Sequence, residues 1–246
     1  MLNESNVSSK EAEHSPAAAV ATALHDGKKH LLLAASGSVA TIKLPLIISS
    51  LEKHHNFSIR VILTKSATNF LAGQSPEQPT VAAVSALPNV DAVYQDEDEW
   101  VEPWKRDGKI LHIELRKWAH LLVIAPLSAN TLAKVSCGFA DNLLTSVIRA
   151  WDTNPLNPER ARIVVAPAMN SCMWDHPITA KQIYVLEEEW GVKGGNPDKG
   201  WIEVLRPQEK MLACGDFGQG GMRAWQEIVV VIEERLRLTT LTLEGS

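Results

Sequence analysis

Three side chains in this sequence have the chemical types that move protons or hold a carboxylate. Cys214 lies in "LACGDFGQGGM" (212–222), beside an aspartate and among four glycines, whereas a core thiol would have apolar neighbours. His112 opens "HIELRKW", and no Ser/His/Asp or Cys/His signature surrounds it. Asn170 follows an apolar run in "PAMNSCMW" (167–174), where it is either a turn residue or an amide for a ligand carboxylate. The residues alone leave these functions open.

Two small-residue turns could hold a phosphate group. In "ASGSVA", Gly37 permits close approach of the backbone, and Ser38 and the first N–H groups of a helix can receive an anion. In "APLSANT", Ser128, Asn130 and Thr131 supply polar groups at a second helix start. Each turn alone is also typical of plain helix capping, but two at one sheet edge favour a phosphate-bearing cofactor. Neither matches the dinucleotide fingerprint or the P-loop.

The elements that must position these residues alternate between strand and helix patterns. Buried apolar runs predict strands at 30–35, 58–64, 120–126 and 161–169, with a short one in 200–205. Helical spacing predicts helices at 38–53, 65–70, 112–119, 128–136, 140–151, 177–190 and 223–237. We therefore expect an α/β fold with a doubly wound parallel sheet that binds ligands at the carboxyl ends of its strands. Residues 73–110 look irregular.

Length and composition predict an ordinary globular protein, with room for one large domain or two small ones. The 246 residues are 45% hydrophobic, and the net charge of -5 argues against nucleic acid or an anionic membrane as the main partner. No apolar run approaches the roughly 20 residues of a membrane span. We expect a disordered N-terminal tail over 1–27 and a single domain over 28–240. Three cysteines without metal-like spacing predict no metal site and a cytoplasmic location.

Other sulfur-bearing and acidic side chains have simpler interpretations. Cys137 lies in an Ala/Val/Leu helical context, and we expect it and Cys172 to be buried and inert. The acidic run at 96–99 is expected to be a solvated loop. Met173 and Trp174 are of types that more often belong to the core than to a ligand site.

Several motifs together resemble one family, the homo-oligomeric flavin-containing cysteine decarboxylases. The resemblance is carried by "LLLAASGSVATIKLP", "LHIELRKWAHLLVIAPLSANTLAK", "FADNLLTSVIRAWD", "VVAPAMNSCMW" and "LACGDFGQGGM". That family includes the 4'-phosphopantothenoylcysteine decarboxylases and the plant and fungal halotolerance proteins. The similarity runs from residue 29 to 223, and its specific signatures are P-x-M-N-x-x-M-W and A-C-G-D.

The resemblance implies a flavodoxin-like, three-layer αβα subunit in a homotrimer, or in a heterotrimer with paralogues, with FMN at the subunit boundary. It places the FMN contacts on Gly37, Ser38, Val39, Thr64, Lys65, Ser66, Ser128, Ala129, Asn130, Thr131 and Ala168. It makes His112 the base, Asn170 the ligand of the substrate carboxylate and Cys214 the proton donor. The implied substrate contacts are Met169, Asn170, Met173, Trp174, Met211 and Ala213.

The implied reaction converts 4'-phosphopantothenoylcysteine to 4'-phosphopantetheine and CO₂, in coenzyme A biosynthesis. It proceeds by oxidation of the cysteinyl thiol, loss of CO₂ and re-reduction of the ene-thiol. A peptidyl-cysteine decarboxylase is one alternative, but those relatives lack the cysteine loop. A halotolerance-type subunit that inhibits a protein phosphatase is another, although such regulators tend to carry long acidic tails, unlike "LTTLTLEGS". Met211 stands where relatives often have a basic residue, so the ligands of the substrate phosphate stay open.

Overall fold

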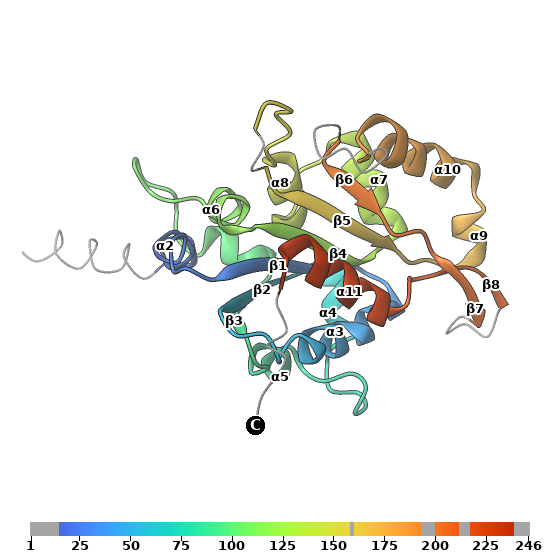
Figure 1. Cartoon of the computed structure of the whole chain (residues 1–246), viewed down its shortest axis with the longest axis horizontal. Coiled ribbons are helices and arrows are strands. Elements are labelled where there is room, and N and C mark those ends of the chain that lie inside the picture. Colours follow the sequence, from blue (N-terminus) through green and yellow to red (C-terminus); the bar gives the residue numbers. More distant parts are fainter. Residues whose placement is uncertain (1–14, 158–159, 193–199, 212–216, 239–246) are drawn as a thin grey trace, which may run out of the picture.

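The molecule is built on a parallel sheet (Figure 1). The structure, a computed structural model, describes residues 15–157, 160–192, 200–211 and 217–238. Within these ranges six parallel strands form one sheet in the order β3-β2-β1-β4-β5-β6. The strands are β1 (Lys29–Ala35), β2 (Phe57–Leu63), β3 (Val90–Tyr94), β4 (Leu121–Leu127), β5 (Arg162–Pro167) and β6 (Ile202–Val204). The order reverses between β1 and β4, where doubly wound sheets bind ligands.

Helices cover both faces of the sheet, as Figure 1 shows. One face carries α2 (Pro16–Thr22), α6 (Leu111–Trp118), α7 (Ala129–Cys137), α8 (Leu143–Arg149) and α10 (Pro177–Tyr184). The other carries α3 (Leu44–Ser50), α4 (Lys65–Thr68), α5 (Val81–Ser85) and α11 (Trp225–Leu236).

Successive residues of each central strand alternate between the cores on the two faces of the sheet. In β1, Leu32 and Ala34 pack in one core, while Leu31 and Leu33 pack in the other. Because both faces are covered, every position of such a strand is apolar, which explains the continuous hydrophobic runs in the sequence. The predicted doubly wound α/β fold with three layers is confirmed.

Shorter elements complete the described chain. They are the 3₁₀ turns η1 (Val39–Lys43) and η2 (Asp96–Trp100), helix α9 (Ser171–Trp174), the π-helical turn η3 (Val185–Glu189), and the antiparallel pair β7 (Gln208–Met211) and β8 (Phe217–Gly221). The helix predicted over 38–53 is divided, because Pro45 lacks an N–H and α3 begins at that point. None of the helices in these ranges is long and apolar enough to cross a membrane.

Several elements lie where the sequence predicts none. The region 73–110 contains α5 and β3, and β3 was missed because it is a half-exposed edge strand without a continuous apolar run. Part of the tail expected to be disordered is the helix α2. Its N-cap Ser15 accepts a hydrogen bond from the N–H of Ala18 (3.2 Å), and Ala17 and Val20 are buried in the core with α6. Residues 1–14 lie outside the described ranges.

Candidate active site

Three helices or helical turns begin directly after strands β1, β2 and β4, and each begins with a hydroxyl side chain. The N-cap residues are Ser38, Thr64 and Ser128. Each side-chain oxygen accepts a hydrogen bond from a backbone N–H two or three residues ahead, at 3.3 to 3.4 Å. Because the three strands are parallel, these starts meet at one edge of the sheet and present backbone N–H groups and hydroxyls together.

Ser36 joins the loops that follow β1 and β4. Its Oγ donates to the carbonyl oxygen of Pro126 (3.1 Å) and accepts from the N–H of Ser128 (2.8 Å). Its own carbonyl accepts from Thr41 Oγ1 (3.2 Å), and the residue is fully buried. Ser36 therefore fixes the two loops relative to each other at the switch point. Sequence reasoning missed it because a serine inside a small-residue turn carries no signal of its burial.

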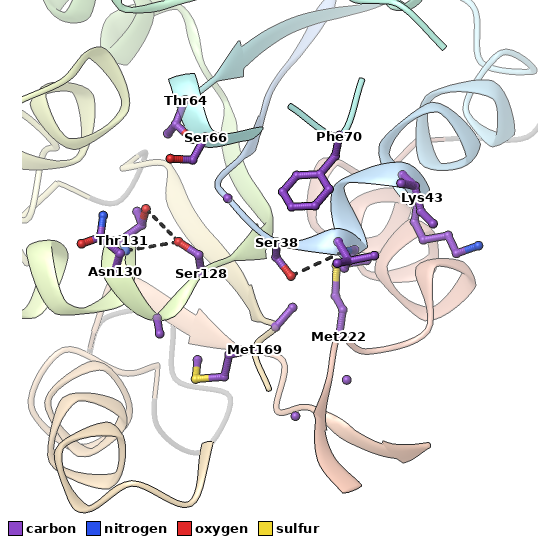
Figure 2. A pocket seen from close by; sticks show the side chains of 18 of the residues that line it. Ser38, Lys43, Thr64, Ser66, Phe70, Ser128, Asn130, Thr131, Met169 and Met222 are labelled. Carbon is purple, nitrogen blue, oxygen red and sulfur yellow. Dashed lines mark hydrogen bonds between the residues drawn. The ribbon is translucent and has the colours of Figure 1, made fainter. Parts of the chain in front are cut away.

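A cavity of about 950 Å³ opens at this edge of the sheet. Small-molecule sites measure roughly 300 to 1,000 Å³, so the cavity has room for a cofactor and a substrate together. In Figure 2 the side chains of Ser38, Ser66 and Ser128 approach it from three different loops. Every FMN contact implied by the resemblance lines it: Gly37, Ser38, Val39, Thr64, Lys65, Ser66, Ser128, Ala129, Asn130, Thr131 and Ala168.

Two glycines allow backbone segments to approach closely beside the cavity. A Cβ atom on Gly37 would lie 2.5 Å from the Cβ of Ser66, and one on Gly220 would lie 2.2 Å from the carbonyl oxygen of Met169. The N–H of Met169 donates to the carbonyl oxygen of Gly220 (2.9 Å), which ties β8 to the end of β5. The described part of the glycine-rich segment therefore forms a wall of the cavity, to which Gly220 and Gly221 contribute.

The residues after β5 supply most of the predicted substrate clamp. Met169, Asn170 and Met173 line the cavity. Asn170 Oδ1 accepts from the N–H of Cys172 (2.9 Å), so Asn170 is the N-cap of α9. A ligand carboxylate would therefore have to accept a hydrogen bond from the amide nitrogen of Asn170. Trp174 does not line the cavity in the described chain, but packs half-buried against the hydrophobic core.

His112, the predicted base, lies outside this cavity in the described part of the chain. It is in the first turn of α6, which packs against α2 (Figure 1). Its Nδ1 is 3.0 Å from Oε1 of Glu99, whose side chain is only 6% exposed. A carboxylate accepts hydrogen bonds, so Nδ1 carries a proton and Nε2 of the neutral ring is the proton acceptor. The fold thus brings His112 to a carboxylate and not to the FMN loops of the same chain.

The acidic run at 96–99 is part of this site region, so its interpretation as a solvated loop is wrong for two residues. Asp96 lines the cavity, and its Oδ1 accepts from the N–H of Leu143 (3.1 Å) at the start of α8. Burial raises the pKa of the Asp96 carboxyl above its usual value. Glu99 is buried beside His112. The run folds into η2, which packs against α6 and α8, and this packing removes both carboxyl groups from full exposure.

The predicted proton donor Cys214 and the predicted contact Ala213 lie outside the described residues. Met211 ends β7, where its backbone pairs with Phe217. The functions assigned to these positions by resemblance stay predictions. The described segments of the hairpin do reach the cavity, because Gln208 at the start of β7 lines it.

Cys137 and Cys172 are both exposed, so the expectation that they are buried is wrong. Cys137 is the last residue of α7, and Cys172 lies in the first turn of α9. The apolar neighbours of Cys137 in the sequence, such as Leu132 and Val135, occupy the buried face of α7 instead. In the described chain no three His, Cys, Asp or Glu side chains form a group that could hold a metal ion.

The lining of the cavity fits a flavin that carries a phosphate. Capping hydroxyls and the N-terminus of α7 suit the phosphate, and Gly37 leaves space that any Cβ would fill. Phe70, Met169 and Met222 provide apolar surface for a flat ring (Figure 2). Both kinds of group are therefore present in one cavity.

Known proteins are similar in sequence to this chain over most of its length. The Flavoprotein family model matches residues 20–237. Phosphopantothenoylcysteine decarboxylase from Arabidopsis thaliana is 44% identical over 197 residues, which cover 79% of this chain and 79% of that protein. Coenzyme A biosynthesis protein 3 from Saccharomyces cerevisiae is 42% identical over 221 residues, covering 86% of this chain and 34% of that protein.

Solved structures share the fold as well. A mutant PPC decarboxylase with a cysteine-to-serine change, complexed with pantothenoylaminoethenethiol, matches with a TM-score of 0.68 and 39% identity over 84% of this chain and 97% of that chain. The FMN binding protein AtHal3 matches with a TM-score of 0.65 and 39% identity over 84% and 96% of the two chains.

The chain spans about a third of the length of the fungal curated relatives that it matches. The shares are 34% for Coenzyme A biosynthesis protein 3 and 30% for a probable thymidylate synthase from Schizosaccharomyces pombe. The similarity to the Arabidopsis protein extends over most of both chains. Since the family model covers nearly all of the described fold, including every loop of the cavity, this chain belongs to the flavoprotein family.

Proposed function

We propose that this chain is an FMN-dependent decarboxylase that converts 4'-phosphopantothenoylcysteine to 4'-phosphopantetheine and CO₂. The observation that carries the proposal is the cavity, which joins all the predicted FMN loops to Met169, Asn170 and Met173. The plant relative named for this activity supports the reaction, and the similarity to an FMN binding protein supports FMN as the flavin. When bound, the flavin supplies the two-electron oxidation of the substrate thiol and its later reversal.

The substrate's own atoms explain why oxidation must precede the loss of CO₂. The carboxylate leaves its electron pair on the adjacent carbon, and an amide nitrogen there stabilises it poorly. Removal of two electrons and two protons from the CH₂–SH group gives a thioaldehyde, which accepts that pair. Loss of CO₂ then gives an ene-thiolate, and the return of a hydride and protons gives the thiol of 4'-phosphopantetheine. The electrons taken in the first step return in the last.

Asn170 and the methionines hold the carboxylate without a positive charge. The amide of Asn170 can donate one hydrogen bond to the carboxylate, while Met169 and Met173 provide apolar surface. A lysine or arginine there would stabilise the charged ground state and so oppose decarboxylation. A neutral donor favours the transition state, in which this charge is spreading into the electron sink.

His112 is the proposed proton acceptor and Cys214 the proposed proton donor. His112 Nε2 accepts a proton during oxidation or decarboxylation, because Glu99 occupies Nδ1. Since His112 lies away from the cavity of its own chain, we place it at the cavity of a neighbouring subunit in a homotrimer. Cys214 donates the proton that accompanies the return of the hydride. The cytoplasmic location expected from composition belongs to the same proposal.

Product analysis of Cys214→Ser tests this assignment. The purified wild-type protein should be yellow from bound FMN and should release CO₂ from 4'-phosphopantothenoylcysteine. The variant should still release CO₂ but should accumulate the oxidised ene-thiol. A colourless wild-type protein that cannot be reconstituted with FMN contradicts the whole proposal. Normal yields of 4'-phosphopantetheine from the variant would remove only Cys214 from the mechanism.

A further inference from the structure

A second cavity lies at the opposite edge of the sheet from the candidate active site. It measures about 900 Å³ and is lined by the first residues of β1, β4 and β5, by the end of α6 and by the end of α11. In Figure 1 these strands run from the side of α2 toward the β7–β8 hairpin, so their amino ends are far from the first cavity. None of the residues placed in the decarboxylase mechanism lines it.

The charge of this second cavity is opposite to that of the whole molecule. Its lining includes seven Lys or Arg side chains and two carboxylates, Asp152 and Glu234, which gives a formal charge of +5. The complete chain carries -5. Positive charge concentrated in a concave site of an acidic protein focuses the field on that site and attracts anions.

Four of these cations form no direct ion pair, although Arg116 lies close enough to Asp152 to lower the pKa of that carboxyl electrostatically. In the described chain Lys29, Arg116, Arg162 and Arg237 form no ion pair, whereas Arg235 is held by Glu203 at 2.8 Å. The Nε atom of Arg116 is buried and lacks a hydrogen-bond partner among the described residues. Because this atom has almost no accessible surface, a ligand in the cavity would have to bind Arg116 through its other guanidinium nitrogens.

Helix dipoles explain only part of this arrangement. Basic residues near the end of a helix stabilise its negative pole, which accounts for Arg116 at the end of α6 and Arg235 at the end of α11. Lys29 and Arg162 instead begin parallel strands, where no such dipole exists. Their presence in the same cavity therefore needs another cause.

His120 lies in the same cavity, where its ring would respond to a bound anion. Its Nδ1 accepts a hydrogen bond from the N–H of His30 (3.0 Å), and its ring stacks on the ring of His30 at 4.7 Å. Burial, together with the neighbouring His30 and Lys29, lowers the pKa of His120, while Asp26 acts weakly in the opposite direction. An anion bound beside this ring would favour its charged form.

We infer that this basic cavity is a second ligand site, which binds a small molecule carrying two or more phosphate groups. Its volume exceeds the space that one phosphate needs, and the cations without an ion pair come from β1, α6, β5 and the residue that follows α11. Arginine pairs with phosphate through parallel N–H bonds, so several arginines suit several phosphates. A long nucleic acid is a poor occupant, because the remainder of this acidic chain would repel it.

Calorimetric titration of the FMN-loaded protein with tripolyphosphate tests the inference, because bound FMN already fills its own phosphate site. At roughly 50 mM salt, where screening is modest, we expect saturable binding. Arg116→Gln/Arg162→Gln should weaken binding about ten-fold or more, since two charge-assisted contacts are lost. The matched control Arg106→Gln/Arg149→Gln removes the same charge from exposed positions outside both cavities and should bind normally.

A second cavity variant controls for misfolding of the first. A signal from His120 distinguishes binding in this cavity from binding at another site. Lys29→Gln/Arg237→Gln changes only exposed side chains of the cavity and should also weaken binding. In NMR spectra tripolyphosphate should raise the pKa of His120. The inference fails if tripolyphosphate does not bind, if both cavity variants bind as well as the control, or if only long oligonucleotides bind. None of these results depends on decarboxylase activity.

Discussion

The contact between His112 and Glu99 is the most informative pair of side chains for the proposed chemistry. Glu99 is nearly inaccessible, its Oε1 lies 3.0 Å from His112 Nδ1, and its Oε2 is buried without a hydrogen-bond partner in the described chain. Burying a carboxylate is costly unless the group is paired and hydrogen-bonded. We interpret Glu99 as the residue that sets the tautomer of His112, as the aspartate of a Ser-His-Asp triad does.

Glu99→Ala should lower kcat about 10- to 100-fold, because His112 would no longer be held with Nε2 as the base. KM should stay close to the wild-type value, since Glu99 does not line the substrate cavity. Glu99→Asp should recover part of the lost activity. The matched control is Glu97→Gln, which alters an exposed residue of the same turn. Unchanged kcat in Glu99→Ala, measured by steady-state kinetics, would show that Glu99 does not act through His112.

Gly37→Ala should lower the free energy of unfolding by about 1 to 3 kcal/mol, the usual cost of overpacking. The added methyl would meet Ser66 Cβ at 2.5 Å, which forces the loops after β1 and β2 apart. The flavin content of the purified protein, measured from visible absorbance, should fall with it. Gly37→Ala/Ser66→Gly removes the opposing atom and should restore most of the stability. Equal losses in the single and double variants would rule out this contact as the cause.

Local patterns in the sequence predict some of these residues and not others. Gly37, Ser38 and Ser128 follow apolar runs in small-residue turns, so their place at a sheet edge was predictable. The functions of Ser36 and Glu99 could not be predicted. Both depend on burial and on contacts that only the folded chain makes, with Ser128 and with His112. His112 lies outside the cavity because of the way α6 packs, and a short sequence motif does not indicate that packing.

At the level of elements, buried strands are predicted best. The bounds of β1, β2, β4 and β5 lie within two residues of the predicted ranges, because a strand covered on both faces must be apolar throughout. The edge strand β3 has a half-exposed pattern that resembles a loop. Helix α2 carries little periodic signal, because in its short sequence PAAAVAT only Val20 is a large apolar residue, although its buried face packs against α6.

Val20→Ala should lower the free energy of unfolding by about 2 kcal/mol, which is the cost of removing two buried methyl-sized groups. Val20 is completely buried between α2 and the core that contains Trp118 of α6. The matched control is Val230→Ala on α11, where the side chain is 49% exposed and the change should cost below about 0.5 kcal/mol. Denaturant unfolding measures both. Equal stability of the two variants would mean that α2 does not pack on the domain.

For the whole molecule, the sheet separates two cavities of different chemistry. The carboxyl edge holds hydroxyls, glycines and the clamp, while the amino edge holds the cations. A chain that binds its cofactor at one edge leaves the other free for a second ligand. No histidine of the described chain lines the first cavity, however, so the proposed reaction requires its base, His112, from a neighbouring subunit.

Mixing two inactive variants tests whether a neighbouring subunit supplies that residue. His112→Asn and Asn170→Ala should each abolish decarboxylation, but coexpression should restore it. In a head-to-tail ring of three, a mixed trimer contains one boundary at which an intact His112 meets an intact Asn170. Random assembly of equal amounts should therefore give about a quarter of the wild-type activity per subunit. Light scattering should give about 81 kDa, three times the 27.0 kDa chain. Trimers that stay inactive on mixing would place both residues in the same subunit's site.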